Sequence, residues 1–93
     1  MTYLITYDIA DPKRLRRICR ILEAYGTRVQ YSVFECPIET RTLLQLWGIL
    51  TQRISLKEDR LCAYPLDVRA CEHTLRAGNM QEAARPGELV IIA

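Results

Sequence analysis

Histidine and glycine are scarce in this chain of 93 residues. His73 is the only histidine, which excludes a ribonuclease mechanism that relies on two histidines. The four glycines are isolated from one another, so no glycine-rich loop can cradle a phosphate group, and no G-x-S-x-G motif marks a serine nucleophile. Any phosphodiester hydrolysis by this chain would therefore have to be assisted by a metal ion.

Long apolar runs are also absent, because no segment approaches the ~20 apolar residues that span a bilayer. The first residues lack the basic start and apolar stretch of a signal peptide, so we expect a cytoplasmic protein with no membrane partner. The cysteines form no C-x-x-C pair for zinc or redox chemistry; they are Cys19, Cys36, Cys62 and Cys71. We interpret them as small buried hydrophobic residues.

The positive charge of the chain is concentrated in one segment, although the formal net charge is only +2. Five of the thirteen basic residues stand within eight positions, with no acid among them: Lys13, Arg14, Arg16, Arg17 and Arg20. Arg28 could extend this group. A single-sign, mostly arginine stripe favours contacts with nucleic-acid phosphates, and the alternative is an ordinary solvated helix face.

Hydrophobic periodicity predicts alternating strands and helices. A β-rich stretch at residues 28–36 should be split into two short strands by a break near Tyr31 and Ser32. The expected elements are a strand at 2–9, a helix at 11–25 ending before Gly26, the two short strands, a helix at 40–54 and a strand at 60–66. This βαββαβ order is the ferredoxin-like α+β fold, an antiparallel sheet with two helices on one face.

The other face of that sheet should be polar if it meets water, but both faces look apolar in the sequence. We therefore expect a second copy of the chain to cover it, which makes the protein a homodimer. The four β-formers at 89–92 would be an aggregation-prone edge unless they added a strand to the partner's sheet. The expected organisation is a core domain at 1–66, a linker with a short helix at 67–87 and a C-terminal strand at 88–93.

The first strand ends on an acid, Asp8, while Asp11 is better placed to cap the following helix. One carboxylate is too little for calcium, but magnesium keeps most of its waters and needs only one or two. Two copies of Asp8 that meet across a two-fold axis would supply that pair. The alternative at this point is a strand-end acid that is hydrogen-bonded to a turn.

Three segments, in this order and spacing, resemble the small CRISPR-associated endoribonuclease family, the ferredoxin-like partners of the integrase that captures new spacers. They are Tyr7-Asp8-Ile9 followed by Asp11 and the arginine-rich helix, residues 28–36 with the core Gln30-Tyr31-Ser32-Val33-Phe34, and residues 59–66. The resemblance covers residues 1–66. Residues 67–87 resemble no segment of that family.

The resemblance implies a homodimer with stacked sheets and exchanged C-terminal strands, and it implies that Asp8 is the catalytic acid and the ligand of Mg²⁺. Residues linked to activity in the family correspond to Tyr7, Arg14 or Arg17, Arg28 and Phe34. The implied partners are the CRISPR-associated integrase and double-stranded DNA, with single-stranded RNA as a second nucleic-acid candidate.

The leading hypothesis is thus a magnesium-dependent endonuclease of CRISPR adaptation, which serves antiviral defence. Three alternatives remain at this level: a non-catalytic DNA-binding scaffold with the same fold and dimer, a toxin-like ribonuclease of related fold, and a ferredoxin-like regulator that binds a small molecule.

Overall fold

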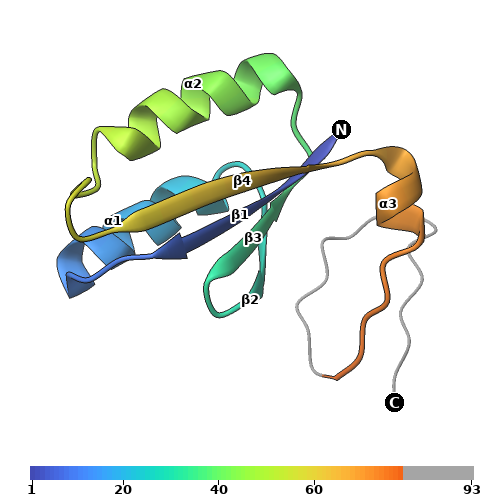
Figure 1. The fold of residues 1–93 in the computed structure, drawn as a ribbon, viewed down its shortest axis with the longest axis horizontal. Coiled ribbons are helices and arrows are strands. Elements are labelled where there is room, and N and C mark those ends of the chain that lie inside the picture. Colours follow the sequence, from blue (N-terminus) through green and yellow to red (C-terminus); the bar gives the residue numbers. More distant parts are fainter. Residues whose placement is uncertain (79–93) are drawn as a thin grey trace.

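Four antiparallel strands and two long helices form the body of the protein (Figure 1). The structure, a computed structural model, describes residues 1–78. In chain order the elements are β1 (Thr2–Asp8), α1 (Pro12–Glu23), β2 (Thr27–Gln30), β3 (Val33–Cys36), α2 (Thr40–Thr51), β4 (Arg60–Leu66) and α3 (Val68–Glu72). The strand order is β2-β3-β1-β4, which confirms the predicted α+β fold. Within residues 1–78, no helix is both long and apolar enough to cross a membrane.

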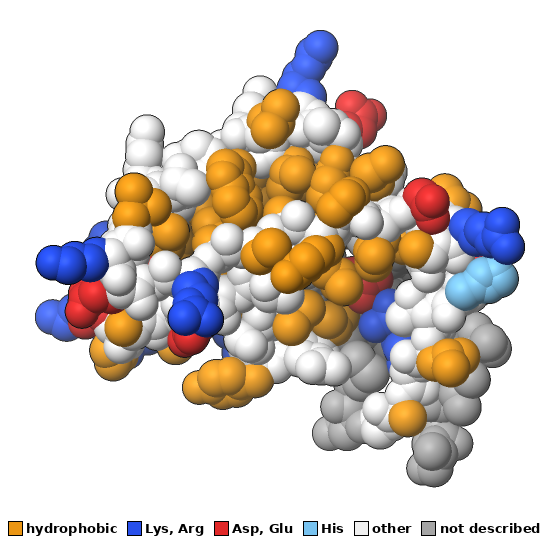
Figure 2. Space-filling view, in the orientation of Figure 1, with side chains coloured by type: hydrophobic (Ala, Val, Ile, Leu, Met, Phe, Trp, Pro, Cys, Tyr) orange, Lys and Arg blue, Asp and Glu red, His pale blue; other side chains and the backbone are white. Residues whose placement is uncertain are grey.

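The core lies between the helices and one face of the sheet. Along β1, Tyr3, Ile5 and Tyr7 are buried, as their alternation with Leu4 and Thr6 predicts. Helix residues complete this core from the other side; they are Ile18, Cys19 and Leu22 of α1 with Leu46 and Leu50 of α2. Figure 2 shows hydrophobic side chains gathered in a band between α2 and the edge strand β4. Both helices therefore cover the same face of the sheet, and we call the opposite one the open face.

The start of α1 follows from its capping residues. Asp11 has extended backbone angles, and its side chain accepts a hydrogen bond from the Arg14 amide at 2.9 Å, while Pro12 occupies the first turn. The helix ends at Glu23, two residues before the predicted end.

Gly26 was expected to end the helix, but the structure shows that its main role is to let the backbone pass close to β3. Its backbone runs so close to β3 that a Cβ atom would lie 2.2 Å from the carbonyl oxygen of Glu35 and 2.7 Å from Sγ of Cys36. Its backbone is also not in the left-handed conformation that a C-terminal glycine cap uses. Glycine is required here by crowding, which only the tertiary structure imposes.

The predicted break at Tyr31 and Ser32 is confirmed, since these residues form the turn between β2 and β3. The hairpin is irregular, with a register shift between Arg28 and Gln30. The hairpin tip is attached to the end of β1, where the Tyr7 amide donates to the Ser32 carbonyl at 3.2 Å. The tip therefore lies beside the strand end that carries Asp8.

The open face is less apolar than the sequence suggested. Leu4 and Tyr64 lie on it, but so does Glu35, which pairs with Leu4 across the sheet and is almost fully buried. Oε2 of Glu35 accepts a hydrogen bond at 2.7 Å from Nη2 of Arg76, in the segment after α3. The expectation of two purely apolar faces is therefore wrong at this position, because a buried ion pair stands there. The predicted C-terminal strand at 88–93 lies outside the described residues.

Candidate nucleic-acid interface and catalytic acid

Helix α1 presents a row of exposed cations on the side that faces away from the sheet. We call these four residues the basic ridge: Lys13, Arg16, Arg17 and Arg20. None of them forms an ion pair with another residue of the range 1–78. Figure 2 shows Lys and Arg side chains that project at the end of the molecule where α1 begins. Unpaired guanidinium groups on a rigid helix are well suited to hydrogen bonds with phosphate oxygens.

A hollow of about 440 Å³ runs between this ridge and α2. All four ridge residues line it, and Arg53, just beyond the end of α2, adds a fifth cation. Ile21 and Ile49 line it as well, and no acid among residues 1–78 does. The sequence analysis did not identify Arg53, because it is isolated in the sequence and only the packing of the two helices brings it to the ridge.

Arg14 belongs to the same basic segment but is placed differently. Its Nε donates to Oδ2 of Asp59 at 2.9 Å and its Nη2 donates to Oδ1 at 3.2 Å, so the guanidinium grips the carboxylate with two bonds. Nη2 also lies 3.4 Å from Oε1 of the exposed Glu58. The Nε and Nη2 donors of Arg14 are thus engaged within the chain, and of the two arginines left open by the resemblance, Arg17 is the one that stays exposed.

Asp59 is the centre of a set of hydrogen bonds that includes those from Arg14, and we call this set of bonds the Asp59 clasp. Its side chain is 0% exposed and also accepts backbone amides from Ala10 at 2.9 Å and from Ser55 at 2.8 Å. The bonds from Arg14, aided by these two amides, lower the pKa of Asp59 to about 2. The clasp ties the turn after β1 to α1 and to the loop before β4. It was missed in the sequence because Asp59 stands in a run of charged residues that reads as a surface loop.

Asp8 ends β1 as an exposed carboxylate on the open face. No hydrogen bond or ion pair connects it to any other residue of the range 1–78, so the alternative of an acid bonded to a turn finds no support in the described part of the chain. Arg60 is its direct partner in the adjacent strand β4, which places both side chains on the same face. Arg60 is exposed and was also missed, because the pairing depends on the sheet register.

The chemistry of this position suits magnesium only in part. A carboxylate is a hard oxygen ligand, and magnesium needs one or two of them beside its waters. Within residues 1–78, however, no group of three or more metal-ligating side chains exists, so the described residues of one protomer do not form a complete set of metal ligands. A metal bound here would complete its coordination with water and, in a dimer, with a second carboxylate.

Three of the residues that the resemblance linked to activity lie in one chain of contacts beneath the ridge; they are Tyr7, Arg28 and Phe34. The Tyr7 hydroxyl donates to the carbonyl of Tyr31 at 3.1 Å and lies 3.3 Å from Sγ of Cys19. Nη2 of Arg28 donates to the same sulfur at 2.9 Å, and its guanidinium lies 5.6 Å from the centre of the Phe34 ring. Burial raises the pKa of Tyr7 well above its ordinary value, so the phenol stays protonated and is not available as a general base.

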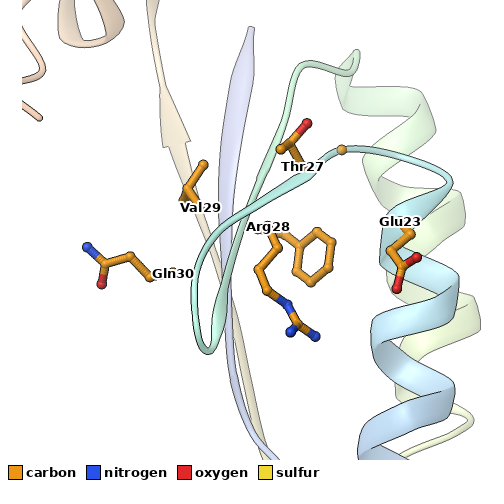
Figure 3. Close-up of a pocket in the computed structure, with 7 residues that line it drawn as sticks. Glu23, Thr27, Arg28, Val29 and Gln30 are labelled. Atoms are coloured by element: carbon orange, nitrogen blue, oxygen red, sulfur yellow. The ribbon is translucent and has the colours of Figure 1, made fainter. Parts of the chain in front are cut away.

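Figure 3 shows how β2 divides its side chains. Arg28 extends toward α1, on the side of Glu23, whereas Val29 and Gln30 lie on the other side of the strand. A hollow of about 590 Å³ lies beside Arg28 and Phe34. Tyr7 and Phe34 are buried, whereas Arg28 is only partly buried and lines this hollow together with Phe34.

These features define a small ferredoxin-like α+β domain with a basic helix and an exposed carboxylate at a strand end. The family model of the CRISPR associated protein Cas2 matches residues 1–74. The chain therefore belongs to the Cas2 family of CRISPR-associated proteins.

Individual relatives agree with this assignment. A CRISPR-associated endoribonuclease Cas2 of Synechocystis sp. is 46% identical over 68 residues, which cover 69% of this chain and 70% of the relative. The crystal structure of Streptococcus pyogenes Cas2 at pH 6.5 superposes with a TM-score of 0.68 at 39% identity, covering 72% of this chain and 87% of that one. A chain of a partial Cas6-RT-Cas1–Cas2 complex gives a TM-score of 0.57 at 29% identity, covering 78% and 86%.

Proposed function

We propose that this protein acts in CRISPR adaptation as a homodimeric, magnesium-dependent endonuclease on nucleic-acid phosphodiesters, and that it bridges dimers of the integrase. Family membership supports the role in CRISPR systems, and relatives are named endoribonucleases. A similar chain occurs in a complex that contains Cas1, which supports an integrase partner.

The observation that carries the catalytic part is the exposed carboxylate of Asp8, which has no ion-pair partner within residues 1–78 and lies beside a strong cation. Arg60 can hold a phosphate oxygen, and Asp8 of one protomer, together with Asp8 of a second, would hold Mg²⁺. The metal would supply an activated water and neutralise charge on the phosphodiester. The chain's own part is to orient the phosphate and to keep the Asp8 carboxylate accessible.

The open face supports the proposal of a dimer. Apolar side chains such as Leu4 and Tyr64 lie on it, and burying them against a second copy contributes roughly 25 cal/mol per Å². Deleting residues 88–93 should weaken this dimer, since we expect them to pair with the partner's sheet. Sedimentation equilibrium compares the dissociation constants, and an equally tight dimer of the shortened chain would show that strand exchange is wrong.

Cleavage of RNA and DNA oligonucleotides by wild type and by Asp8→Asn, each with Mg²⁺ and with chelator, tests the catalytic proposal. We expect cleavage to be lost in the variant while its circular dichroism spectrum and dimer mass are unchanged, because an exposed strand-end acid contributes little packing. Glu39→Gln is the control, since Glu39 is an exposed acid whose side chain does not cap α2. Equal cleavage by wild type and Asp8→Asn would refute the assignment.

A non-catalytic DNA-binding scaffold is the second candidate. One observation favours it: residues 1–78 hold no metal-binding cluster, whereas five cations surround the hollow beside the basic ridge. The same experiment separates the two. If neither wild type nor Asp8→Asn cleaves while both bind duplex DNA with equal affinity, the scaffold function is the correct one.

A further inference from the structure

On its other side, the basic ridge borders a second hollow, which lies between α1 and the tip of the β2–β3 hairpin. Its volume is about 310 Å³, at the lower end of the roughly 300–1,000 Å³ of small-molecule sites. Arg16, Arg20 and Arg28 line it together with Tyr31, and Glu23 is the only acid that the described part of the chain adds to its lining. Three guanidinium groups against one carboxylate leave this hollow net positive.

The Arg28 guanidinium and the backbone of Tyr31 are held in place before any ligand binds. Arg28 donates to Sγ of Cys19, and its guanidinium stacks over Phe34, so little side-chain entropy remains to be lost on binding. The backbone of Tyr31 is fixed by the hydrogen bond that its carbonyl accepts from Tyr7. The Tyr7 hydroxyl has a single hydrogen to donate, and it donates this hydrogen to the Tyr31 carbonyl. Its contact with Cys19 is therefore best satisfied when the thiol is the donor. Each group then donates to the next, from Arg28 through Cys19 and Tyr7 to the hairpin tip.

The ring of Tyr31 has no such packing. Tyr31 is 82% exposed, whereas the aromatic rings of Tyr7 and Phe34 are buried. A single exposed aromatic residue needs no functional explanation by itself. Here, however, it lies at the rim of a hollow lined by arginines, which combines a flat π surface with donors for phosphate oxygens. Proteins that bind single-stranded nucleic acid use this combination, with bases stacked on aromatic rings and cations on the backbone.

We propose that Arg16, Arg20, Arg28 and Tyr31 form a binding site for an unpaired nucleotide next to a duplex, with the base stacked on Tyr31 and its phosphates held by the arginines. This inference rests on the proposed binding of nucleic acid by the basic ridge. Bases inside a duplex have both faces covered by their neighbours, so the tyrosine selects a single-stranded extension. The ridge residues Arg16 and Arg20 line both hollows, which makes the strand path continuous from duplex to extension.

Fluorescence anisotropy with the full chain tests the site, using a blunt DNA duplex and the same duplex with a single-stranded thymidine overhang. Tyr31→Ala should weaken binding of the overhang duplex by about 5- to 150-fold, the range for one base stacked on an aromatic side chain, and leave the blunt duplex unchanged. Tyr31→Phe keeps the ring and should bind as wild type does. Leu56→Ala is the control, since Leu56 is also 82% exposed but lies in another loop.

Three results would overturn the inference: equal affinity of wild type and Tyr31→Ala for the overhang duplex, an equal loss on both duplexes, or a changed sedimentation mass of Tyr31→Ala, which would place Tyr31 in self-association. Failure of the underlying function looks different. In that case wild type binds neither duplex. The same conclusion follows if a variant with glutamine in place of Lys13 and Arg17, two residues that do not line this hollow, binds the blunt duplex as tightly as wild type does.

Discussion

Replacement of Asp59 by asparagine should destabilise the protein strongly, although Asp59 lies in a charged loop segment of the sequence. The side chain of Asp59 is 0% exposed and accepts bonds from Arg14, Ala10 and Ser55. An asparagine has one acceptor oxygen for these donors and turns an NH₂ group toward the rest. Loss of one partner of a buried ion pair costs about 3–5 kcal/mol, and the lower end applies because the side chain of Arg14 is 26% exposed and can be hydrated.

Thermal unfolding followed by circular dichroism, at one fixed protein concentration, measures this cost. For a domain of this size each kcal/mol shifts Tm by about 4–8 °C, so a loss of ~3 kcal/mol lowers Tm by about 12–24 °C. The control is Glu58→Gln, which removes the other partner of the same guanidinium but at a site that is 61% exposed. Glu58→Gln should lower the free energy of unfolding by less than about 1 kcal/mol.

The pH dependence of the stability gives a second, independent test of the role of Asp59. The pKa of Asp59 is about 2 in the folded protein, against an ordinary value of 3.8. A depressed pKa stabilises the fold above pH ~4, and this contribution of about 2 kcal/mol is lost as the pH falls toward 2. The Tm difference between wild type and Asp59→Asn should therefore shrink over that range. If Asp59→Asn loses no more stability than Glu58→Gln, or if the difference is independent of pH, the Asp59 clasp does not hold these loops together.

Three further predictions concern glycine and charge. Gly26→Ala should destabilise by about 1–3 kcal/mol in urea unfolding, because its Cβ would collide with the Glu35 carbonyl; a neutral result would refute the crowding. Gly48→Ala should instead stabilise by about 1 kcal/mol, since a Cβ on this exposed helical position meets no atom within 4 Å, and an unchanged midpoint would contradict it. Glutamine at Lys13, Arg17 and Arg53 together should reduce the slope of log affinity against log salt by about 3 for duplexes of any sequence, whereas an unchanged slope would make the ridge a solvated face.

Local patterns in the sequence were sufficient to predict the helices and strands. Strand β1 follows from alternation, and α1 follows from Asp11 and Pro12 at its start, because capping and side-chain periodicity act between residues close in the chain. The break at Tyr31 and Ser32 was visible for the same reason. The end of α1 was predicted two residues too late, because Gly26 was interpreted as a helix cap. Its actual role is to allow the close approach of the backbone to β3.

The members of the candidate sites depended on contacts between segments far apart in the chain. The basic stripe of α1 could be predicted because helical periodicity places its cations on one face, and Asp8 because it ends an apolar strand. Arg53 joins that stripe only through the packing of α2 on the sheet, and Arg60 meets Asp8 only through the register of β4 with β1. Register and helix packing depend on the whole core, so the sequence determined which residues could bind phosphate, and the tertiary structure decided which of them stand together and which, like Arg14, are bound within the fold.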